Sequence, residues 1–320
     1  MTISHTLAAA RVAFGERRWI DVLALMEAAE AEAPLGIEDL ERWGRAASIQ
    51  GRDEVSFALL ARCYELSRER DPGRAAHHAF WYGYRLLSLG ETAQGGAWLA
   101  RAEEMVAAAG GDSVVTGYLA LPKIRRHLAQ QDYEAAAALA REAGAIGARY
   151  GDADLKALAV ELEGRALISM GEVEDGLRRF DQAMLTASES RGSELVRGLV
   201  YCSVIAGCQL VFAVDHAREW TAVLAKWCET QPQLGMFTST CRVHRAELMQ
   251  MGGAWADALA EIAVLEASPR LGAVDRAGAA YQQAEIHRAR GEQAAAEAAY
   301  ARAGEAGGET QPGLCLLYTI

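Results

Sequence analysis

Hydrophobic and polar positions along the chain follow one frame that returns many times. In residues 171–184, GEVEDGLRRFDQAM, a turn at Gly171 is followed by a small residue at Gly176, a large apolar residue at Phe180 and another small residue at Ala183. Spacings of four and three residues place these side chains on one helix face. The small residues let a second helix lie close, and the large one fills the groove. The frame therefore predicts a helical hairpin.

Looser and closer copies of this frame follow eight turn positions. These positions are Arg17, Gly51, Gly90, Gln131, Gly171, Phe212, Gly253 and Gly291. Neighbouring turns lie between 34 residues apart, as from 17 to 51, and 41 apart, as from 90 to 131. Such a period is typical of a helical repeat array. We expect an all-α protein, a right-handed α-solenoid of about eight hairpins that forms a single domain over residues 1–320.

Two features test this interpretation along the chain. The segment Leu199–Val214 is apolar enough for a buried strand, but its length and small residues favour a buried helix. Five prolines fall where links between hairpins are expected: Pro34, Pro72, Pro232, Pro269 and Pro312. Pro122 is the exception, and we expect it to start or kink a first helix.

Four segments carry a further resemblance. They are WYGYRLLSLGETAQGGAWLARAEEMV, GDADLKALAVELEGRALISMGEVEDGLRRFDQAM, YCSVIAGCQLVFAVDHAREWTAVLAKWCETQP and CRVHRAELMQMGGAWADALAEI. The hairpins resemble tetratricopeptide (TPR) repeats, although the usual period there is about 34 residues. From Trp19 to Gly313 the chain resembles the TPR-like region of large actinobacterial LuxR-type transcriptional regulators. That resemblance implies a sensory or interaction module, with DNA contacted by a separate C-terminal helix-turn-helix.

The last residues depart from that pattern. After QPGLCLLYTI no helix-turn-helix follows, so direct DNA binding is not carried over to this sequence. The apolar run behind Pro312 looks like the beginning of a ninth hairpin, whereas an array normally closes with a polar capping helix. Three alternatives remain, with truncation preferred: a shortened chain, a tail that folds back, or a contact with a second copy in a homodimer.

Composition narrows the classes of partner. The net charge is −11, and no local cluster of Lys and Arg offsets it, so a direct nucleic-acid partner is not expected. The N-terminal residues do not have the pattern of a signal peptide, and no stretch approaches 18 uncharged apolar residues. Six scattered cysteines without a CxxC pair suit reduced thiols. We predict a soluble cytoplasmic protein.

First helices of such arrays usually line the binding face. Positions six residues before the turns are Arg45, Tyr84, Arg125, Arg165, Ala206, Glu247 and Glu285, so the groove changes from basic to acidic along its length. His77, Phe80 and Tyr84 share a helix face and could form an aromatic patch, or could simply be packing residues. Likewise, Glu41 with Arg45 and Glu161 with Arg165 are i, i+4 pairs that could neutralise each other.

We therefore predict that a protein or peptide partner docks in this concave groove. The candidate groove residues are Arg45, His77, Phe80, Tyr84, Arg125, Arg165, Cys202, Gln209, Glu247 and Glu285. The alternative is a sensor that binds a small-molecule effector in a central apolar pocket around Tyr201, Cys202, Ile205 and Gln209. An enzyme with an enclosed cavity is the third class.

Chemistry-bearing motifs are few. Cys241 and His244 have CxxH spacing, with Glu247 one turn further and Cys228 nearby, but four ligands are not visible. We predict no metal and no cofactor. The sequence holds no GxSxG, GxxxxGK[ST], HExxH or dinucleotide-binding motif, and we expect no enzymatic activity.

Overall fold

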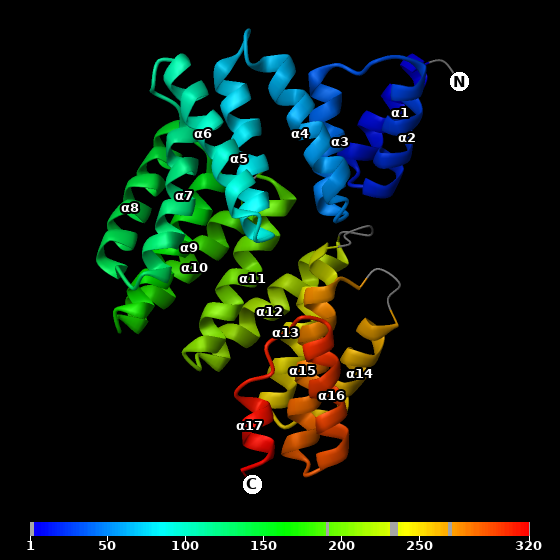
Figure 1. Ribbon diagram of the computed structural model, residues 1–320, viewed down its shortest axis with the longest axis vertical. Coiled ribbons are helices and arrows are strands. Elements are labelled where there is room, and N and C mark those ends of the chain that lie inside the picture. Colours follow the sequence, from blue (N-terminus) through cyan, green and yellow to red (C-terminus); the bar gives the residue numbers. More distant parts are fainter. Residues whose placement is uncertain (1–2, 190–191, 231–235, 268–270, 320) are drawn as a thin grey trace. The chain divides into compact units, whose positions relative to one another are not determined.

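The computed structural model describes residues 3–189, 192–230, 236–267 and 271–319, and all regular structure within these ranges is helical (Figure 1). The helices are α1 Ile3–Gly15, α2 Trp19–Glu32, α3 Ile37–Ile49, α4 Asp53–Ser67, α5 Pro72–Ser88, α6 Thr92–Ala108, α7 Val114–Ala129, α8 Tyr133–Tyr150, α9 Ala153–Ser169, α10 Val173–Glu189, α11 Glu194–Leu210, α12 Val214–Glu229, α13 Met236–Met251, α14 Trp255–Glu266, α15 Ala273–Ala289, α16 Gln293–Glu305 and α17 Gly313–Leu317. The predicted all-α class is confirmed. No described helix combines the length and apolar character needed to span a membrane.

Helices that follow each other in sequence pack as antiparallel pairs. This pairing holds for α1 with α2, α3 with α4, α5 with α6, α7 with α8, α9 with α10, α13 with α14 and α15 with α16. The described residues up to Gly207 form one compact unit, and those from Cys208 onward form a second.

All eight predicted turn residues adopt positive φ. Glycine does so at Gly51, Gly90, Gly171, Gly253 and Gly291, and non-glycine residues do so at Arg17 (φ 58°), Gln131 (62°) and Phe212 (56°). At Gly90 the turn closes as a Schellman motif, since Glu91 N–H donates to Leu86 O at 3.0 Å and Gly90 N–H to Leu87 O at 3.1 Å. Glycine takes this conformation without a Cβ penalty, whereas other residues lose about 1 kcal/mol.

Within a hairpin, a pair of glycines brings the backbones of its two helices into contact. A Cβ on Gly83 of α5 would lie 2.8 Å from the carbonyl oxygen of Gly95 on α6. A Cβ on Gly164 of α9 would lie 2.9 Å from the Gly176 carbonyl oxygen and 2.8 Å from Phe180 Cδ1 on α10. No side chain fits between these backbones, so the predicted small residues set the helix separation.

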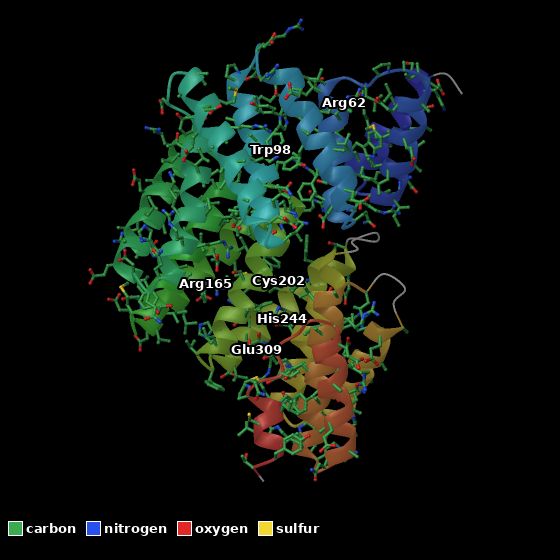
Figure 2. All side chains as sticks on the ribbon, in the orientation of Figure 1. Arg62, Trp98, Arg165, Cys202, His244 and Glu309 are labelled. Carbon is green, nitrogen blue, oxygen red and sulfur yellow. The ribbon has the colours of Figure 1, made fainter. Side chains whose placement is uncertain are left out.

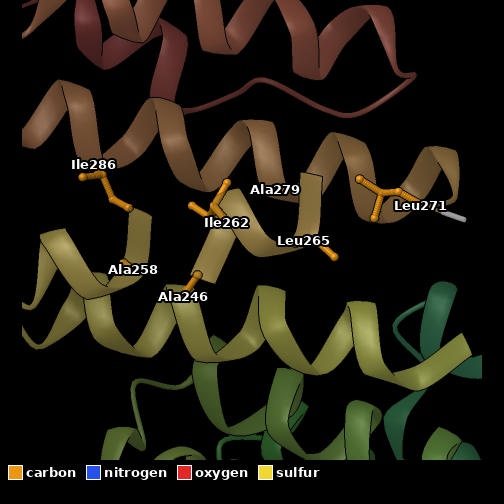
Figure 3. Packing of buried hydrophobic residues seen from close by; sticks show 7 residues of the cluster. All are labelled: Ala246, Ala258, Ile262, Leu265, Leu271, Ala279 and Ile286. Carbon is orange, nitrogen blue, oxygen red and sulfur yellow. The ribbon is translucent and has the colours of Figure 1, made fainter. Parts of the chain in front are cut away.

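Large residues of the frame fill the space left beside these crossings. Phe180 is fully buried, and it packs so closely on α11 that a Cβ on Gly207 would lie 2.5 Å from its ring. In the second unit, Figure 3 shows the corresponding packing of α13, α14 and α15. That cluster consists of Ala246, Ala258, Ile262, Leu265, Leu271, Ala279 and Ile286.

The structure settles several local expectations. Residues 199–210 continue α11, so the helical interpretation of this apolar segment is confirmed. Pro72 is the first residue of α5 and follows the capping residue Asp71. Of the two expectations for Pro122, that it starts a first helix is wrong, because α7 begins at Val114, where the Ser113 hydroxyl accepts a hydrogen bond from Val115 N–H at 3.2 Å. Pro122 lies inside α7, and the kink expected there stays a prediction. Pro232 and Pro269 lie outside the described residues.

The segment after Pro312 forms the short helix α17. This helix packs against α15 and α16, and Leu314 and Leu317 contact the cluster that contains Tyr300. Among the alternatives for the apolar tail, this arrangement is the one that folds back onto the preceding hairpin.

The glycine crossing predicts a steep response to one methyl group. Gly164→Ala should lower the free energy of unfolding by about 2 kcal/mol, because the new Cβ meets a carbonyl oxygen and a buried ring. Gly96→Ala on the exposed side of α6 is the matched control, since a Cβ there meets nothing within 4 Å. It should be neutral or stabilising by up to about 1 kcal/mol. Urea denaturation measures both, and equal effects would contradict the close crossing.

Candidate functional site

A cavity of about 380 Å³ lies among the helices of the first unit. Its walls come from α3, α4 and α5, from Tyr118 on α7, and from the beginnings of α9 and α11. An ion pair of 3.1 Å between Arg17 Nε and Glu194 Oε1 joins the first hairpin turn to the start of α11. First helices of successive hairpins thus converge on one space, and residues far apart in sequence meet there.

The apolar part of the wall combines leucines with aromatic rings. Leu40 and Leu59 are buried, and Leu60 is half-buried. The rings of Trp81 and Tyr118 lie beside each other with centroids 5.8 Å apart. This side of the cavity suits an aliphatic or aromatic group of a ligand.

Glu41 is the best-held charge of the cavity. Both of its carboxylate oxygens accept hydrogen bonds of 2.7 Å from Arg74, and Oε1 lies 2.8 Å from His78 Nε2. Burial would raise the pKa of Glu41, but the hydrogen bonds from Arg74 and His78 outweigh it and lower this pKa to about 2. The expected Glu41–Arg45 neutralisation is wrong, because the fork of Arg74 reaches Glu41 from the next hairpin with two bonds. Arg45 lies with its guanidinium 5.8 Å from the centre of the Phe14 ring.

His78 is 4% exposed, and one of its ring nitrogens has no hydrogen-bond partner among the described residues. Because ionised Glu41 can only accept, the proton between the two groups belongs to His78 Nε2. In the neutral ring Nδ1 is then a hydrogen-bond acceptor. Among the described residues nothing donates to this buried Nδ1. A buried polar atom without a hydrogen-bond partner is unusual in native proteins, so this nitrogen stands out in the cavity wall.

His77 plays a different part in the same wall. The indole N–H of Trp81 donates to His77 Nε2 at 3.0 Å, so the ring carries its proton on Nδ1. Burial, together with the neighbouring His78, lowers the pKa of His77 to about 4. The ring is therefore neutral at pH 7 and adds no positive charge to the cavity.

Two carboxylates stand at the beginning of α9. Asp152 caps the helix by accepting from Leu155 N–H at 2.8 Å, and it also accepts from Tyr118 Oη at 2.9 Å. Asp154 accepts from Ser193 N–H, at 3.1 Å to Oδ1 and 2.9 Å to Oδ2. Burial raises the pKa of Asp154 to about 6, against the lowering effect of the Ser193 bond. This carboxylate is poorly solvated and has no ion pair among the described residues.

The structure brings only two of the predicted groove residues into this cavity, Arg45 and His77. Phe80 and Tyr84 are buried and stack with ring centroids 5.3 Å apart, which is the packing alternative. Arg125 donates from Nε to Tyr84 Oη at 2.9 Å.

The remaining predicted positions of the first unit lie away from the cavity lining. Arg165 pairs with Glu161 at 3.1 Å, as the i, i+4 alternative predicts, and also donates to the Ser203 hydroxyl at 2.8 Å. Cys202 is half-buried on α11 (Figure 2). Tyr201 and Ile205, expected around an effector pocket, are buried. Ala206 is exposed.

Three predicted positions belong to the second unit. Gln209 donates from Nε2 to Glu247 Oε2 at 2.7 Å, and burial raises the pKa of Glu247. Glu285 accepts from Arg288 at 2.6 Å and from the Tyr300 hydroxyl. The two acidic side chains thus have partners within their own unit.

The CxxH spacing can be followed only in part. The side chain of Cys241 lies outside the described residues, and His244 is half-buried on α13 (Figure 2). Burial lowers the pKa of His244 to about 4. Within the described part of the chain, no three His, Cys, Asp or Glu side chains are grouped as metal ligands would be.

The sequence analysis missed Asp152 and Asp154. Their only local signal is the pattern of acids before and inside a first helical turn, which ordinary capping explains equally well. Trp81 and Tyr118 were missed for a related reason, because an aromatic residue on an array helix is most often packing.

Comparisons with known proteins add little to this geometry. No protein-family model and no curated protein sequence matches the chain. Among solved structures, the chain is similar to the crystal structure of the P58(IPK) TPR domain, with 13% sequence identity and a TM-score of 0.31, over 98% of this chain and 96% of that one. The evidence for the hairpin architecture is the pairing of consecutive helices in this chain.

Because the pKa of Asp154 is raised, replacing Asp154 with a neutral residue should stabilise the fold, and the gain in stability should depend on pH. Below about pH 4 the Asp154 carboxyl is protonated in both the folded and the unfolded chain. Between about pH 4 and 6 only the folded chain keeps the proton, and above about pH 6 the folded chain carries the full free-energy cost of a buried carboxylate. Asp154→Asn should therefore raise the free energy of unfolding by about 1–2 kcal/mol at pH 8 and change it little near pH 4, after allowance for partial exposure.

Asp257→Asn is the matched control for this measurement. Asp257 is exposed and stands in the first turn of α14, as Asp154 does in α9. Its loss should cost a few tenths of a kcal/mol through the helix dipole. Urea unfolding of both variants at pH 4 and at pH 8 measures these changes in the free energy of unfolding. An Asp154→Asn variant that is destabilised at pH 8 would contradict the description of Asp154 as a buried carboxylate.

Proposed function

We propose that the chain is a non-catalytic interaction module that binds a protein or peptide partner, and that the first-unit cavity receives part of that partner. The observation that carries this proposal is a cavity of about 380 Å³ with an apolar wall and, among the described residues, one buried lining nitrogen, His78 Nδ1, without a hydrogen-bond partner. Ligand-binding recesses have about this size and this mixture of linings. Helical repeat arrays commonly bind on the face that their first helices line.

The chemistry of the lining supports binding rather than catalysis. Burial raises the pKa of the Cys63 thiol to about 12, which keeps it protonated and unreactive. The Ser48 hydroxyl lies 2.6 Å from the Ser56 hydroxyl and not beside a base. Glu41 is held in its ion pair, and neutral His77 accepts from Trp81. None of these groups forms a nucleophile–base pair.

The finer assignment is a sensory or interaction module of a transcriptional regulator in the cytoplasm. It rests on the resemblance of the four segments to LuxR-type regulators alone. Under this proposal, the module binds no nucleic acid itself and reports the presence of its partner through the array.

A small-molecule effector is the second candidate. The dimensions of the cavity favour it, since about 380 Å³ lies near the lower end of the range for small ligands. In this case the effector site is the cavity beside Trp81 and Tyr118, and not the region around Tyr201 and Ile205.

A substitution that fills the cavity distinguishes binding in the cavity from binding elsewhere on the chain. Gly44 lines the cavity, and a Cβ there meets only Leu59 Cβ at an ordinary 3.6 Å, so Gly44→Leu should fold with its side chain occupying the space. Gly96→Leu, on the exposed side of α6, is the matched control. Peptides selected from a displayed random library against the native chain should bind Gly44→Leu at least tenfold more weakly and Gly96→Leu unchanged.

Fluorescence anisotropy measures these affinities, and thermal unfolding confirms that both variants fold. If Gly44→Leu is unfolded, Gly44→Ala gives the same comparison with a smaller expected loss. Selected peptides that bind all variants equally would place their site outside the cavity and contradict the proposal.

A further inference from the structure

We propose that the first-unit cavity takes a cationic group on an unbranched aliphatic stem, with the head held by Asp154 and His78 and the stem lying along Trp81 and the leucines. An alkylammonium or guanidinium group, as on a lysine or arginine side chain, has this chemistry. This inference rests on the proposed function and names the part of the partner that enters the cavity.

Among the described residues that line the cavity, ion pairing leaves two carboxylates without a charged partner. Glu41 is neutralised by Arg74, and Arg85 donates to Asp53 Oδ1 at 2.5 Å. Asp152 and Asp154 remain as carboxylates without an ion pair among the described residues. Glu194, next to Ser193 in the lining, pairs with Arg17.

The one lining cation without an ion pair in the described structure is Arg45, and it does not close on these acids. Arg45 is exposed, and its guanidinium lies against the Phe14 ring. Its charge acts on Asp154 only at a distance, with no hydrogen bond between the two groups. Two acids facing one distant cation favour a positively charged ligand.

His78 supplies an independent sign of the same ligand. Its side chain is 4% exposed and lines the cavity, and Nδ1 is a buried ring nitrogen without a hydrogen-bond partner among the described residues. An ammonium group carries three N–H donors and a guanidinium carries five, and neither has an acceptor. A cation can therefore donate to Asp154, and to His78 Nδ1 when that ring is neutral, whereas an anionic ligand would place acceptors against the Asp154 carboxylate.

The aromatic wall completes the match. Trp81 is half-buried beside Tyr118, and indole and phenol rings attract a cation and cover the methylene groups that carry it. The hydroxyl of Tyr118 is committed to Asp152, which fixes the ring against the carboxylates. A volume of about 380 Å³ holds such a side chain with part of its backbone.

Titration of Asp154 adds a pH signature to this site. The pKa of Asp154 is raised to about 6, mainly by burial and also by Asp152, the N-cap of α9, and Glu194 from α11, while the Ser193 bond and Arg45 from α3 act in the lowering direction. His77, across from Asp152, stays neutral. Binding of a cation requires the ionised carboxylate, so affinity should fall as the pH drops below about 6.

Positional-scanning peptides test the inference without a known partner. The probes are fluorescein-labelled nonapeptide pools with random flanks and a fixed central Lys, Arg, norleucine or Glu, together with cadaverine as a free amine. We expect the Lys and Arg pools to bind the native chain at least tenfold more tightly than the norleucine pool. Asp154→Asn should remove this preference, and Arg45→Gln should keep or increase it.

The outcomes separate this inference from the proposed function. Pools that bind without preference for Lys or Arg, and that Gly44→Leu still excludes, would overturn the inference and leave the proposed function intact. A preference that survives Asp154→Asn, or that Arg45→Gln abolishes, would also overturn it.

Absence of binding by every pool would instead refute peptide binding. Cadaverine then decides the inference, because binding that Asp154→Asn abolishes supports the cation site with a small molecule as its source. If cadaverine also fails to bind, both proposals are overturned.

Discussion

The distance to which the two helices of a hairpin can approach is the constraint on which the rest of the structure depends. At Gly83 and Gly95, and again at Gly164 and Gly176, the backbones are so close that no Cβ fits between them. Turn residues in the left-handed region bring the second helix back at this distance. Because each hairpin is thin at its crossing, large residues such as Phe180 can reach the next hairpin.

Stacking at this spacing aligns residues that are about one repeat apart. Arg74 reaches Glu41, 33 positions earlier, and Tyr118 reaches Asp152, 34 positions later. The Ser193 amide reaches Asp154 across 39 positions. These bonds all connect first-helix regions of neighbouring hairpins, so they join the repeats and shape the cavity at once. The period of the sequence is therefore visible in the side-chain bonds and not only in the helices.

The sequence predicts the fold well because the fold depends on local signals. All eight turns lie at the predicted residues, since a left-handed turn residue and small residues at helical spacing act within one hairpin. The cavity could not be predicted in the same way. Whether Glu41 pairs with Arg45 or with Arg74 depends on how the next hairpin stacks, and i, i+4 spacing says nothing about that competitor.

The same limit explains why the groove residues were only partly found. Counting six residues back from each turn identified Arg45 and Tyr84 alike, but Tyr84 stacks on Phe80 and only Arg45 reaches the cavity. The inward face of a helix and the face that packs on the next hairpin are separated by a small rotation. A fixed offset cannot tell them apart when the period varies from 34 to 41 residues, as between turns 17 and 51 and turns 90 and 131.

Stability alone does not explain the composition of the cavity wall. A neutral residue at the position of Asp154 would avoid a desolvated carboxylate whose pKa is raised to about 6, and a hydrogen-bond partner for His78 Nδ1 would satisfy a buried ring nitrogen. Elsewhere in the first unit, buried charged groups such as Glu161 form ion pairs. Under the proposed function, the ligand completes interactions that the fold leaves open in this recess, since a hydrogen-bond donor relieves the desolvated Asp154 carboxylate.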